Sequence, residues 1–474
     1  MENNIKHQNY EYLSSRFKRQ DRNFCNNNFS QQQSSSDQDS ADYSLGGDGR
    51  NRYCRSKKDY QKRFLNLGNK LYLRVHLALY LLQKMTDKTD RALEWEVNDN
   101  AVYQIFCGLN VTPLKRCPDH TNIQRFRSRL SPEIQRKLAN MLPKVATELG
   151  FADPSKADFD STIQEPNMAY PSDANMLMQL AGHAHKFAEY FKNHMPITKK
   201  VINPILINIK KVKGKLKEYL FIAKKKSEEK KEKLKEFIEL ASQEISKVSQ
   251  VHLTEKCMER MPQGVSQSFR KVKELSKKMF EQAHYYLEHG KACKDRLYSL
   301  HAIAVTCFNK NKLGKKWQFG RAFQLARVKG NFMFVGKCTN VLMTDKSSVI
   351  PMIEEHQRLF GKNRLESASW DKGYFKGTNK KFLDNLESLK DFALQKPGQA
   401  IEAIDQKKQE AYLHLVNRRS GVEPCIGHVK NGGQLKRSRM KSDKTTLAAG
   451  YGAVTGYNLR MLIRHQLGKK ISSM

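Results

Sequence analysis

The chain has 474 residues, with 85 Lys and Arg against 48 Asp and Glu, so its formal net charge is +37. This charge exceeds what solubility requires and predicts a polyanionic partner, nucleic acid before membrane, whose binding weakens as salt rises. No segment reaches the roughly 18 uninterrupted apolar residues of a membrane span, and the first residues lack a secretory pattern, which argues against a membrane or secreted protein. At about 150 residues per domain, the length predicts three units.

Residues 1–60 are rich in Asn, Gln, Ser and charge, including the run Gln31–Ser36, and poor in apolar side chains. Such a segment buries too little apolar surface to offset its ordering entropy, so we expect a mobile polar and basic tail. The nine cysteines form no C-x-x-C pair. This spacing favours reduced thiols in the cytoplasm over a zinc site.

Residues 61–150 predict an all-helical domain. Apolar residues between Leu71 and Met85 recur at helical spacing. Asp119–Asn122 is a polar N-cap sequence that opens a short basic helix over Ile123–Leu130. This pattern is typical of a recognition helix in a major groove, or of a surface helix whose basic face is solvated.

A strand and a helical segment come next in the chain. Lys156–Ile163 alternates and ends in β-branched residues, which predicts a strand. In the Lys-rich region that follows, apolar residues over Ile202–Ala223 and over Leu234–Val248 recur at steps of three and four. This spacing predicts helices that pack on one another, so we expect a helical hairpin or bundle inserted into another domain.

A second block rich in β-structure begins at Trp317. Trp317–Ala326 and Asn331–Gly336 predict two strands joined by the turn pair Lys329-Gly330. A helix over 349–360 and a strand over 364–370 follow, and a closing helix over 446–465 ends the pattern. Alternating strands and helices predict an α/β fold in which Asp160 and Asp371 lie at or beside strands of one sheet.

Three carboxylates stand out among the many cations. Asp160 and Asp371 belong to separate strands, and Glu423 is spaced from Arg419 and Lys430 by one and two helical turns. Two-metal phosphoryl transfer needs carboxylates that converge from separate elements, and magnesium suits such a site. Each also has a structural interpretation. Asp160 caps a strand or pairs with a lysine, Asp371 favours a turn, and Ser420 with Glu423 matches a capping box.

Together, Asp160-Ser161-Thr162, Asp371-Lys372-Gly373-Tyr374 and the run Arg419-x3-Glu423-x6-Lys430 resemble the DDE signature of bacterial insertion-sequence transposases of the large transposase-four/transposase-five type. The tyrosine usually found three residues before this arginine is replaced by Val416. The segments 87–109 and 118–130 resemble the InsH-like amino-terminal domain of the same transposases. The resemblance covers roughly half the chain, and its motifs occur in order.

The resemblance implies a ribonuclease-H-like catalytic core of residues 151–185 and 313–474. A long helical insertion, 186–312, separates its first and second strands, and an all-helical DNA-binding domain, 61–150, precedes it. Asp160, Asp371 and Glu423 would hold two Mg²⁺ ions, for which Mn²⁺ can substitute. Phosphates would be held by Arg419, Lys430, Arg418, His428, Lys436, Arg437 and Arg439. The ends of the element would be recognised by Asn122, Gln124, Arg125, Arg127 and Arg129.

The function implied is that of a cytoplasmic, nucleoid-associated transposase that cleaves an element at its terminal inverted repeats and joins the 3' ends to target DNA. Acting on two ends at once predicts a homodimer on DNA. The basic run 436–441 is then a flexible loop that clamps the DNA backbone, or simply a solvated loop. A non-catalytic basic nucleic-acid-binding protein and an inactive transposase copy remain as alternatives.

Overall fold

The computed structural model describes residues 73–109, 117–194, 202–222, 227–312, 315–338, 344–398 and 406–468. The chain divides into two compact units. One consists of the residues up to Leu79 and Glu94–Leu130, and the other of Tyr80–Leu93 and Ser131–Met474. The tail predicted for residues 1–60 lies outside the described part. Within that part, no helix has the length and apolar character needed to cross a membrane.

The described part of the smaller unit is helical, as predicted, but the predicted bounds 61–150 are wrong, because Tyr80–Leu93 and the chain from Ser131 onward belong to the larger unit. It contains α5 (Ala101–Cys107), α6 (His120–Arg129) and parts of α3 (Leu73–Thr86) and α4 (Asp90–Asp99), two helices that it shares with the larger unit. The Asp119 carboxylate accepts hydrogen bonds from the backbone N–H groups of Thr121 and Asn122 at the start of α6. The predicted N-cap of this basic helix is therefore confirmed.

The larger unit is built on a mixed sheet. Its strands are β1 (Asp153–Gln164), β2 (Thr306–Lys312), β3 (Lys315–Lys329), β4 (Phe332–Val335), β5 (Ser367–Ser369) and β6 (Asp391–Ala393). β3 is antiparallel to β1, β2 and β4, whereas β5 is parallel to β1 and β6. The central strand β1 thus joins an antiparallel half of the sheet to a parallel half.

The sequence located four of the six strands of this sheet, but it missed β6 and also β2, which lies within the segment 186–312 expected to be a helical insertion. Each of the predicted strands overlaps an observed one, and the turn between β3 and β4 follows Lys329 as expected. Gly330 and Asn331 both adopt positive φ there, 97° and 63°. Glycine and asparagine are among the residues that adopt this conformation most readily, which explains why the turn pair could be identified from the sequence.

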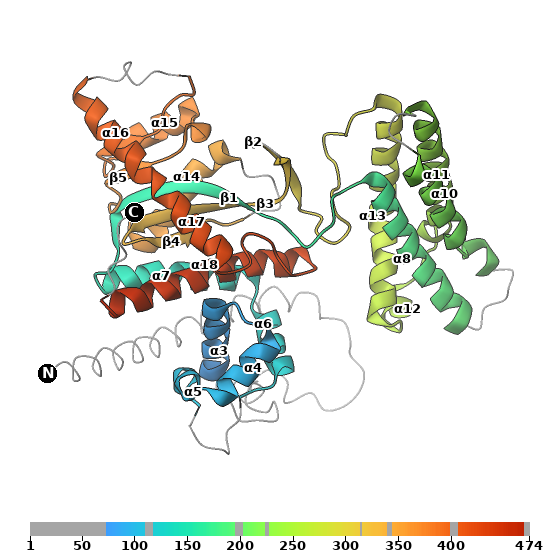
Figure 1. Ribbon diagram of the computed structural model, residues 1–474, viewed down its shortest axis with the longest axis horizontal. Coiled ribbons are helices and arrows are strands. Elements are labelled where there is room, and N and C mark those ends of the chain that lie inside the picture. The colour runs from blue at the N-terminus through green and yellow to red at the C-terminus, as the bar shows by residue number, and fades with distance from the viewer. Residues whose placement is uncertain are drawn as a thin grey trace, which may run out of the picture. The chain divides into compact units, whose positions relative to one another are not determined.

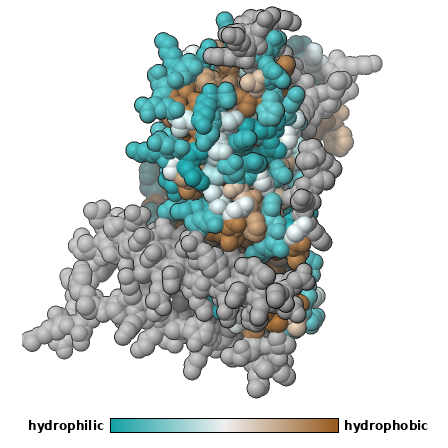
Figure 2. Space-filling view, turned by 90° about the vertical axis from the view of Figure 1, so that its left-hand side faces the viewer, coloured by the Kyte–Doolittle hydropathy of each residue, from teal (hydrophilic) through white to brown (hydrophobic). Residues whose placement is uncertain are grey.

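Helices cover both sides of the sheet (Figure 1). α7 (Pro132–Glu148) and α18 (Asp443–Gln466) pack along each other and on β4, on one side, and α14 (Asp345–Phe360) packs on β1 and β3 on the other. The remaining elements are η2 (Lys372–Tyr374), α15 (Gly377–Asp384), α16 (Gln406–Ser420) and α17 (Val422–Asn431). On the face drawn in Figure 2, hydrophilic residues of the described part surround smaller hydrophobic patches, as the high charge predicts.

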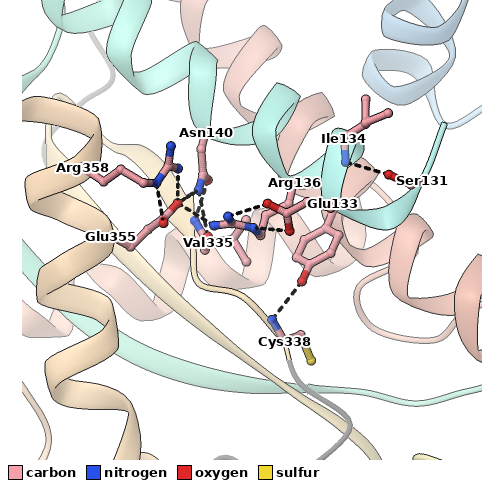
Figure 3. Close-up of polar contacts among 10 residues, drawn as sticks. Ser131, Glu133, Ile134, Arg136, Asn140, Val335, Cys338, Glu355 and Arg358 are labelled. Atoms are coloured by element: carbon pink, nitrogen blue, oxygen red, sulfur yellow. Dashed lines mark hydrogen bonds and ion pairs between the residues drawn. The ribbon is translucent and has the colours of Figure 1, made fainter. Parts of the chain in front are cut away.

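Two asparagines fasten these helices to the edge strand β4. The Asn140 amide donates to the Val335 carbonyl at 2.9 Å and its oxygen accepts from the Val335 N–H at 2.9 Å (Figure 3). Asn458 does the same for Met333, at 2.7 and 2.9 Å. Beside Asn140, Arg136 pairs with Glu355 of α14 at 2.6 Å (Figure 3). Side-chain amides thus complete the backbone hydrogen bonding of a strand that has no further neighbour.

A helical bundle with its own core follows β1 in the chain, where an insertion was predicted. Its elements are α8 (Asp173–His194), η1 (Asn203–Ile205), α10 (Ile209–Phe221), α11 (Ser227–Ser249), α12 (Glu255–Glu259) and α13 (Gln263–His289). α8 packs on α11 and α13 through buried residues such as Leu180 and Phe187, so the bundle begins near residue 173, earlier than the expected 186.

The predicted helix over 202–223 was too long. Its first part forms only the short η1, and α10 begins after Asn208, whose side chain accepts a hydrogen bond from the Lys211 N–H. Pro204 and this N-cap restart the helix, while Ala223 lies outside the described residues. By contrast, the apolar seam of α11 is buried as predicted.

The hydrogen bonds that the Asn458 side chain both donates and accepts yield a prediction about stability. Asn458 is fully buried and bonds backbone groups of β4 and α7. Replacing it by alanine leaves three buried backbone groups unsatisfied, so Asn458→Ala should lower the free energy of unfolding by about 3 kcal/mol. Urea unfolding followed by circular dichroism would measure this. The exposed Asn363→Ala is the control, and an equal loss in both variants would contradict the assigned role.

Candidate functional site

Asp160 lies within β1, and Asp371 lies two residues beyond the end of the neighbouring strand β5. Asp158 of β1 is in register with Ser369 of β5, and the two strands run parallel. Asp160 and Asp371 each follow two residues later, so they extend the same pair of strands beyond this register position. Because side chains repeat every two residues along a strand, Asp158 and Asp160 share one face of β1. The prediction that both aspartates sit on one sheet is therefore confirmed.

Arg419 lies between these two aspartates. Its Nη1 is 3.6 Å from Oδ2 of Asp160, and its Nη2 is 3.9 Å from Oδ1 of Asp371. The side chains of Arg419 and Asp160 are about four-fifths buried, at 19% and 21% exposure, while Asp371 is 56% exposed. These separations exceed a hydrogen bond, so the contacts are electrostatic. Two carboxylates thus share a single guanidinium.

A third carboxylate, Asp345, belongs to the same cluster and was missed from the sequence. It is the first residue of α14, and the Gln324 amide of β3 donates to its Oδ1 at 3.2 Å. A side-chain carbon placed on Gly373 would stand 3.9 Å from Oδ2 of Asp371 and 4.0 Å from Oδ2 of Asp345. An Asp after Thr344 at a helix start is an ordinary N-terminal pattern, so no chemical signal marked Asp345 in the sequence.

The cluster concentrates negative charge in a partly buried place. Burial raises the pKa of Asp160, and repulsion by Asp371 and Asp345 raises it further, against the opposing effects of the Ser161 N–H and Arg419. Burial also raises the pKa of Tyr374, with the same three carboxylates adding to the effect. An additional cation would relieve this repulsion.

Asp158, on the same strand, has a different environment. It is buried, and its carboxylate binds Arg327 at 2.7 Å and Arg418 at 2.8 Å, while the Ser369 hydroxyl donates to it at 2.6 Å. The other two guanidinium nitrogens of Arg418 donate to Ser367 and to backbone carbonyls. Arg418 was expected to bind a phosphate, but its contacts place it in the structural core of the sheet.

Glu423 was expected to join the two aspartates as a metal ligand. It is exposed in the first turn of α17, and the expected capping box does not form, because the N-cap is Gly421 and the Ser420 hydroxyl donates to the Asn417 carbonyl. Within the described ranges, no group of three His, Cys, Asp or Glu side chains is arranged to hold a metal ion, whether Glu423 or Asp345 is taken as the third. The role of Glu423 as the third ligand therefore stays a prediction.

The other predicted phosphate ligands form a separate group. Lys430, Lys436, Arg437 and Arg439 line a cavity of about 350 Å³. His428 of α17 is exposed, and the structure assigns it to neither group. The loop that carries the last three cations was expected to be flexible, but it is fixed: the Glu165 N–H donates to the Lys436 carbonyl and the Ser438 N–H to the Glu165 carbonyl, at 3.1 and 2.8 Å.

The residues expected to read DNA ends divide by exposure along α6. Gln124, Arg125 and Arg129 are exposed, whereas Arg127 is half-buried. The Asn122 side-chain amide donates to Asp119 at 2.9 Å, which commits it to the N-cap. Ile123 and Phe126 are buried and anchor the opposite face of the helix. The exposed stripe is the part of α6 that remains a candidate for base contacts.

Two aromatic positions complete the site. Trp370, next to Asp371, stacks on Phe159 with ring centroids 4.6 Å apart, so it is part of the core as expected. Val416, at the position of the missing tyrosine, is partly exposed. Tyr412, two helical turns before Arg419, donates to Gln395 at 3.0 Å. Burial raises the pKa of Tyr412, while nearby Arg419 lowers it and Asp371 raises it. A tyrosine therefore does lie near the cluster, one turn earlier than the family pattern.

Comparison with known proteins gives one family and one relative. Residues 55–129 match the family described as "Transposase domain (DUF772)". Over 120 residues, 24% of this chain, the sequence is 25% identical to "Uncharacterized protein ORF8 in nfe locus" of Rhizobium meliloti, of which the match spans 58%. No solved structure matches. These findings support a transposase-related role, and the family match concerns the amino-terminal part of the chain.

Asp158 and Asp160 of β1 yield opposite predictions. Asp158→Asn leaves two largely buried guanidinium groups without a counter-charge and should lower the free energy of unfolding by about 3–5 kcal/mol. Asp160→Asn removes a carboxylate that burial and repulsion disfavour, and should raise it by about 1 kcal/mol. Urea unfolding of both variants measures the contrast. Destabilisation of Asp160→Asn by more than that amount would refute this account of the cluster.

The difference in the free energy of unfolding between Asp160→Asn and the wild type should depend on pH. The pKa of Asp160 in the folded protein lies above its usual value of 3.8. Between these two values the folded state binds more protons than the unfolded state, so the contribution of Asp160 to stability falls as pH rises through that window. The advantage of Asp160→Asn over the wild type should accordingly grow from about pH 4 to about pH 7. A constant difference across this range would show that Asp160 does not titrate as described.

Proposed function

We propose that this chain is a DDE-type DNA transposase that binds the terminal inverted repeats of an insertion sequence, cleaves the element at its ends and joins the 3' ends to target DNA. The observation that carries the proposal is that Asp160 of β1 and Asp371, just beyond the parallel neighbour β5, both lie around Arg419. The transposase-domain match over 55–129 supports it independently, because it lies in another part of the chain.

The sheet supports a ribonuclease-H-like core. Its path of paired strands runs β2, β3, β1, β5 and β6, with β4 also paired to β3, and α14 precedes β5 and α15 precedes β6 in the chain. This order places the carboxyl end of β5 beside the middle of β1, and ligand sites form at the carboxyl ends of parallel strands. The helical bundle lies between β1 and β2 in the sequence, and β1 still pairs with β5.

Oxygen donors at this place suit magnesium. Asp160 and Asp371 would hold the ion, and the raised pKa of Asp160 marks the repulsion that a divalent cation relieves. Bound there, two such ions would activate a water or a 3'-hydroxyl and stabilise the leaving oxygen of the phosphodiester. The third metal-binding carboxylate would be Glu423 according to the family resemblance, or Asp345 according to its position in the structure. Mutation of each residue distinguishes the two alternatives.

Arg419 has a defined task in this proposal. Without a cation, its guanidinium balances Asp160 and Asp371 from 3.6 and 3.9 Å, distances too long for firm hydrogen bonds. A guanidinium also matches the geometry of a phosphate. Arg419 is thus placed to transfer from the carboxylates to the scissile phosphate of bound DNA. The partner is double-stranded DNA, held by a homodimer that brings both element ends together in the bacterial cytoplasm.

A second candidate function is a non-catalytic basic DNA-binding protein. It is favoured by the same ion pairs, because Arg419 already balances the two aspartates, and by the finding that, within the described residues, no three potential ligand side chains are arranged to hold a metal. In that case the carboxylate cluster is structural. If the chain is a transposase, loss of a carboxylate removes DNA cleavage. If it is only a DNA-binding protein, it does not cleave DNA, and loss of a carboxylate leaves DNA binding unchanged.

Excision tests the proposal. A plasmid carrying the gene with its native flanking DNA is incubated with purified protein and Mg²⁺, and excised product is quantified. Asp160→Asn and Asp371→Asn should each lower excision on the order of 100-fold or more, since even outer-shell partners of metal ligands cost 10–100-fold. DNA binding, measured by gel shift, should largely survive. Excision retained by either variant would end the assignment.

The third carboxylate is decided in the same assay. Glu423→Gln and Asp345→Asn are compared, with the exposed Asp391→Asn of β6 as the control for loss of one negative charge. If Glu423 is the ligand, its variant alone loses excision as Asp160→Asn does. If Asp345 is the ligand, the loss moves to Asp345→Asn and Glu423→Gln stays active. A comparable loss in Asp391→Asn would show that the effect is one of net charge.

A further inference from the structure

A cationic site lies just beyond the carboxyl end of β1, a few residues after Asp160. The loop 431–440, here called the basic loop, pairs with the chain just after β1 through a bridge between Glu165 and Arg437. Lys430 and three cations of the basic loop line the cavity already described, together with Asn167 and Asp87. Among the lining residues, four carry positive charge and only Asp87 carries negative charge.

Asp87 is held close to one of these cations. Its Oδ2 lies 2.6 Å from Nη2 of Arg439, and both side chains are partly open to solvent, at 35% and 56% exposure. Carboxylates and phosphates make the same paired contacts with a guanidinium. In the structure, Asp87 therefore occupies the position on Arg439 that a phosphate oxygen would take.

The turn that carries Asp87 is fixed on α18. Arg460 donates to the Met85 carbonyl at 2.7 Å, and a side-chain carbon on Gly456 would fall 1.9 Å from the Lys84 carbonyl oxygen. This close approach needs glycine at position 456. Asp87 has a φ of 51°, a left-handed conformation that aspartate and asparagine adopt more readily than most residues. The carboxylate is therefore positioned by the fold and does not simply drift to a neighbouring cation.

Buried side chains and a hydrogen bond to Gln164 hold the basic loop in place. Leu435 and Ser438 are buried between the exposed Lys436, Arg437 and Arg439. The Gln164 amide donates to the Gln434 carbonyl at 2.8 Å. A loop that is already ordered loses little conformational entropy when it binds a ligand. Alternating buried and exposed residues thus present the cations in one arrangement.

We propose that this cavity binds a backbone phosphate of DNA, and that Asp87 is an internal competitor that holds Arg439 until the phosphate displaces it. The inference deepens the proposed function and rests on it for the identity of the polyanion. Asp160 and Glu165 are five residues apart on one strand, at most roughly 17 Å. That length corresponds to about five phosphates along a DNA strand, so one bound duplex spans both sites.

The competitor role predicts a variant that binds DNA more tightly. Asp87→Asn keeps the size of the side chain and tolerates the same backbone conformation, but it removes the charge. An exposed ion pair is worth up to about 1 kcal/mol, so affinity should rise by up to about fivefold. Fluorescence anisotropy with a labelled 30-base-pair duplex of arbitrary sequence, at several KCl concentrations, measures the change.

A double-mutant cycle makes the test specific to Arg439. Arg439→Gln should weaken binding and reduce the slope of log K against log salt by about 0.9. In the Arg439→Gln background, Asp87→Asn should no longer tighten binding, because the cation it releases is absent. The matched control is Asp295→Asn, which removes the same charge from another exposed ion pair, with Lys278 at 2.7 Å.

Each outcome has a separate meaning. Equal tightening by Asp87→Asn and Asp295→Asn, or tightening that persists without Arg439, would overturn the competitor role. If the wild type binds the duplex and Asp87→Asn changes nothing, the cavity proposal fails while the transposase proposal stands. If the wild type does not bind duplex DNA even at low salt, both fail. Tightening by Asp87→Asn in a protein that shows no excision would uphold the phosphate site and remove the enzymatic assignment.

Discussion

The arrangement of the site depends on one buried ion cluster, that of Asp158 with Arg327 and Arg418. The carboxylate joins β1 to β3 through Arg327 and to α16 through Arg418, and Arg418 also bonds Ser367 of β5. Charges removed from water are stable only when they are paired in this way. With Arg418 fixed in the core, the chain direction of α16 is set, and the next residue, Arg419, is delivered to Asp160 and Asp371.

Neighbouring residues of the same type therefore have opposite environments. Asp158 is buried and Arg418 hydrogen-bonds several partners, whereas Asp160 and Arg419, two and one positions further on, meet at 3.6 Å without a hydrogen bond. The first pair stabilises the sheet. The second keeps repulsion among Asp160, Asp371 and Asp345, which raises the pKa of Asp160. Repulsion of this kind is typical of sites that bind a ligand. It lowers the free energy of unfolding, and the pair of Asp158 with Arg418 offsets this loss.

A similar balance exists at the basic loop. Four cations line one cavity with a single carboxylate, and that carboxylate comes from a turn 352 residues away in the chain. In both places an internal partner of opposite charge stands where a ligand of the proposed reaction would bind: Arg419 in place of a cation, and Asp87 in place of a phosphate. A bound metal ion would replace Arg419 as the partner of the aspartates, and a DNA phosphate would replace Asp87 as the partner of Arg439. Neither replacement requires a change in the fold.

The sequence by itself determined the local features. Period-two and helical spacing located the strands around 156–163 and 317–336 and the apolar face of α11, turn chemistry located Gly330, and the polar N-cap at Asp119 located α6, because each depends on residues within a few positions of one another. It also placed Asp160 and Asp371 on one sheet. Only the tertiary structure showed that Asp345 lies near them, that Arg418 is structural, and that Asp87 meets Arg439. These contacts join residues far apart in the chain, as with the 260 positions between Asp158 and Arg418, and a local pattern carries no information about which distant charges packing brings together.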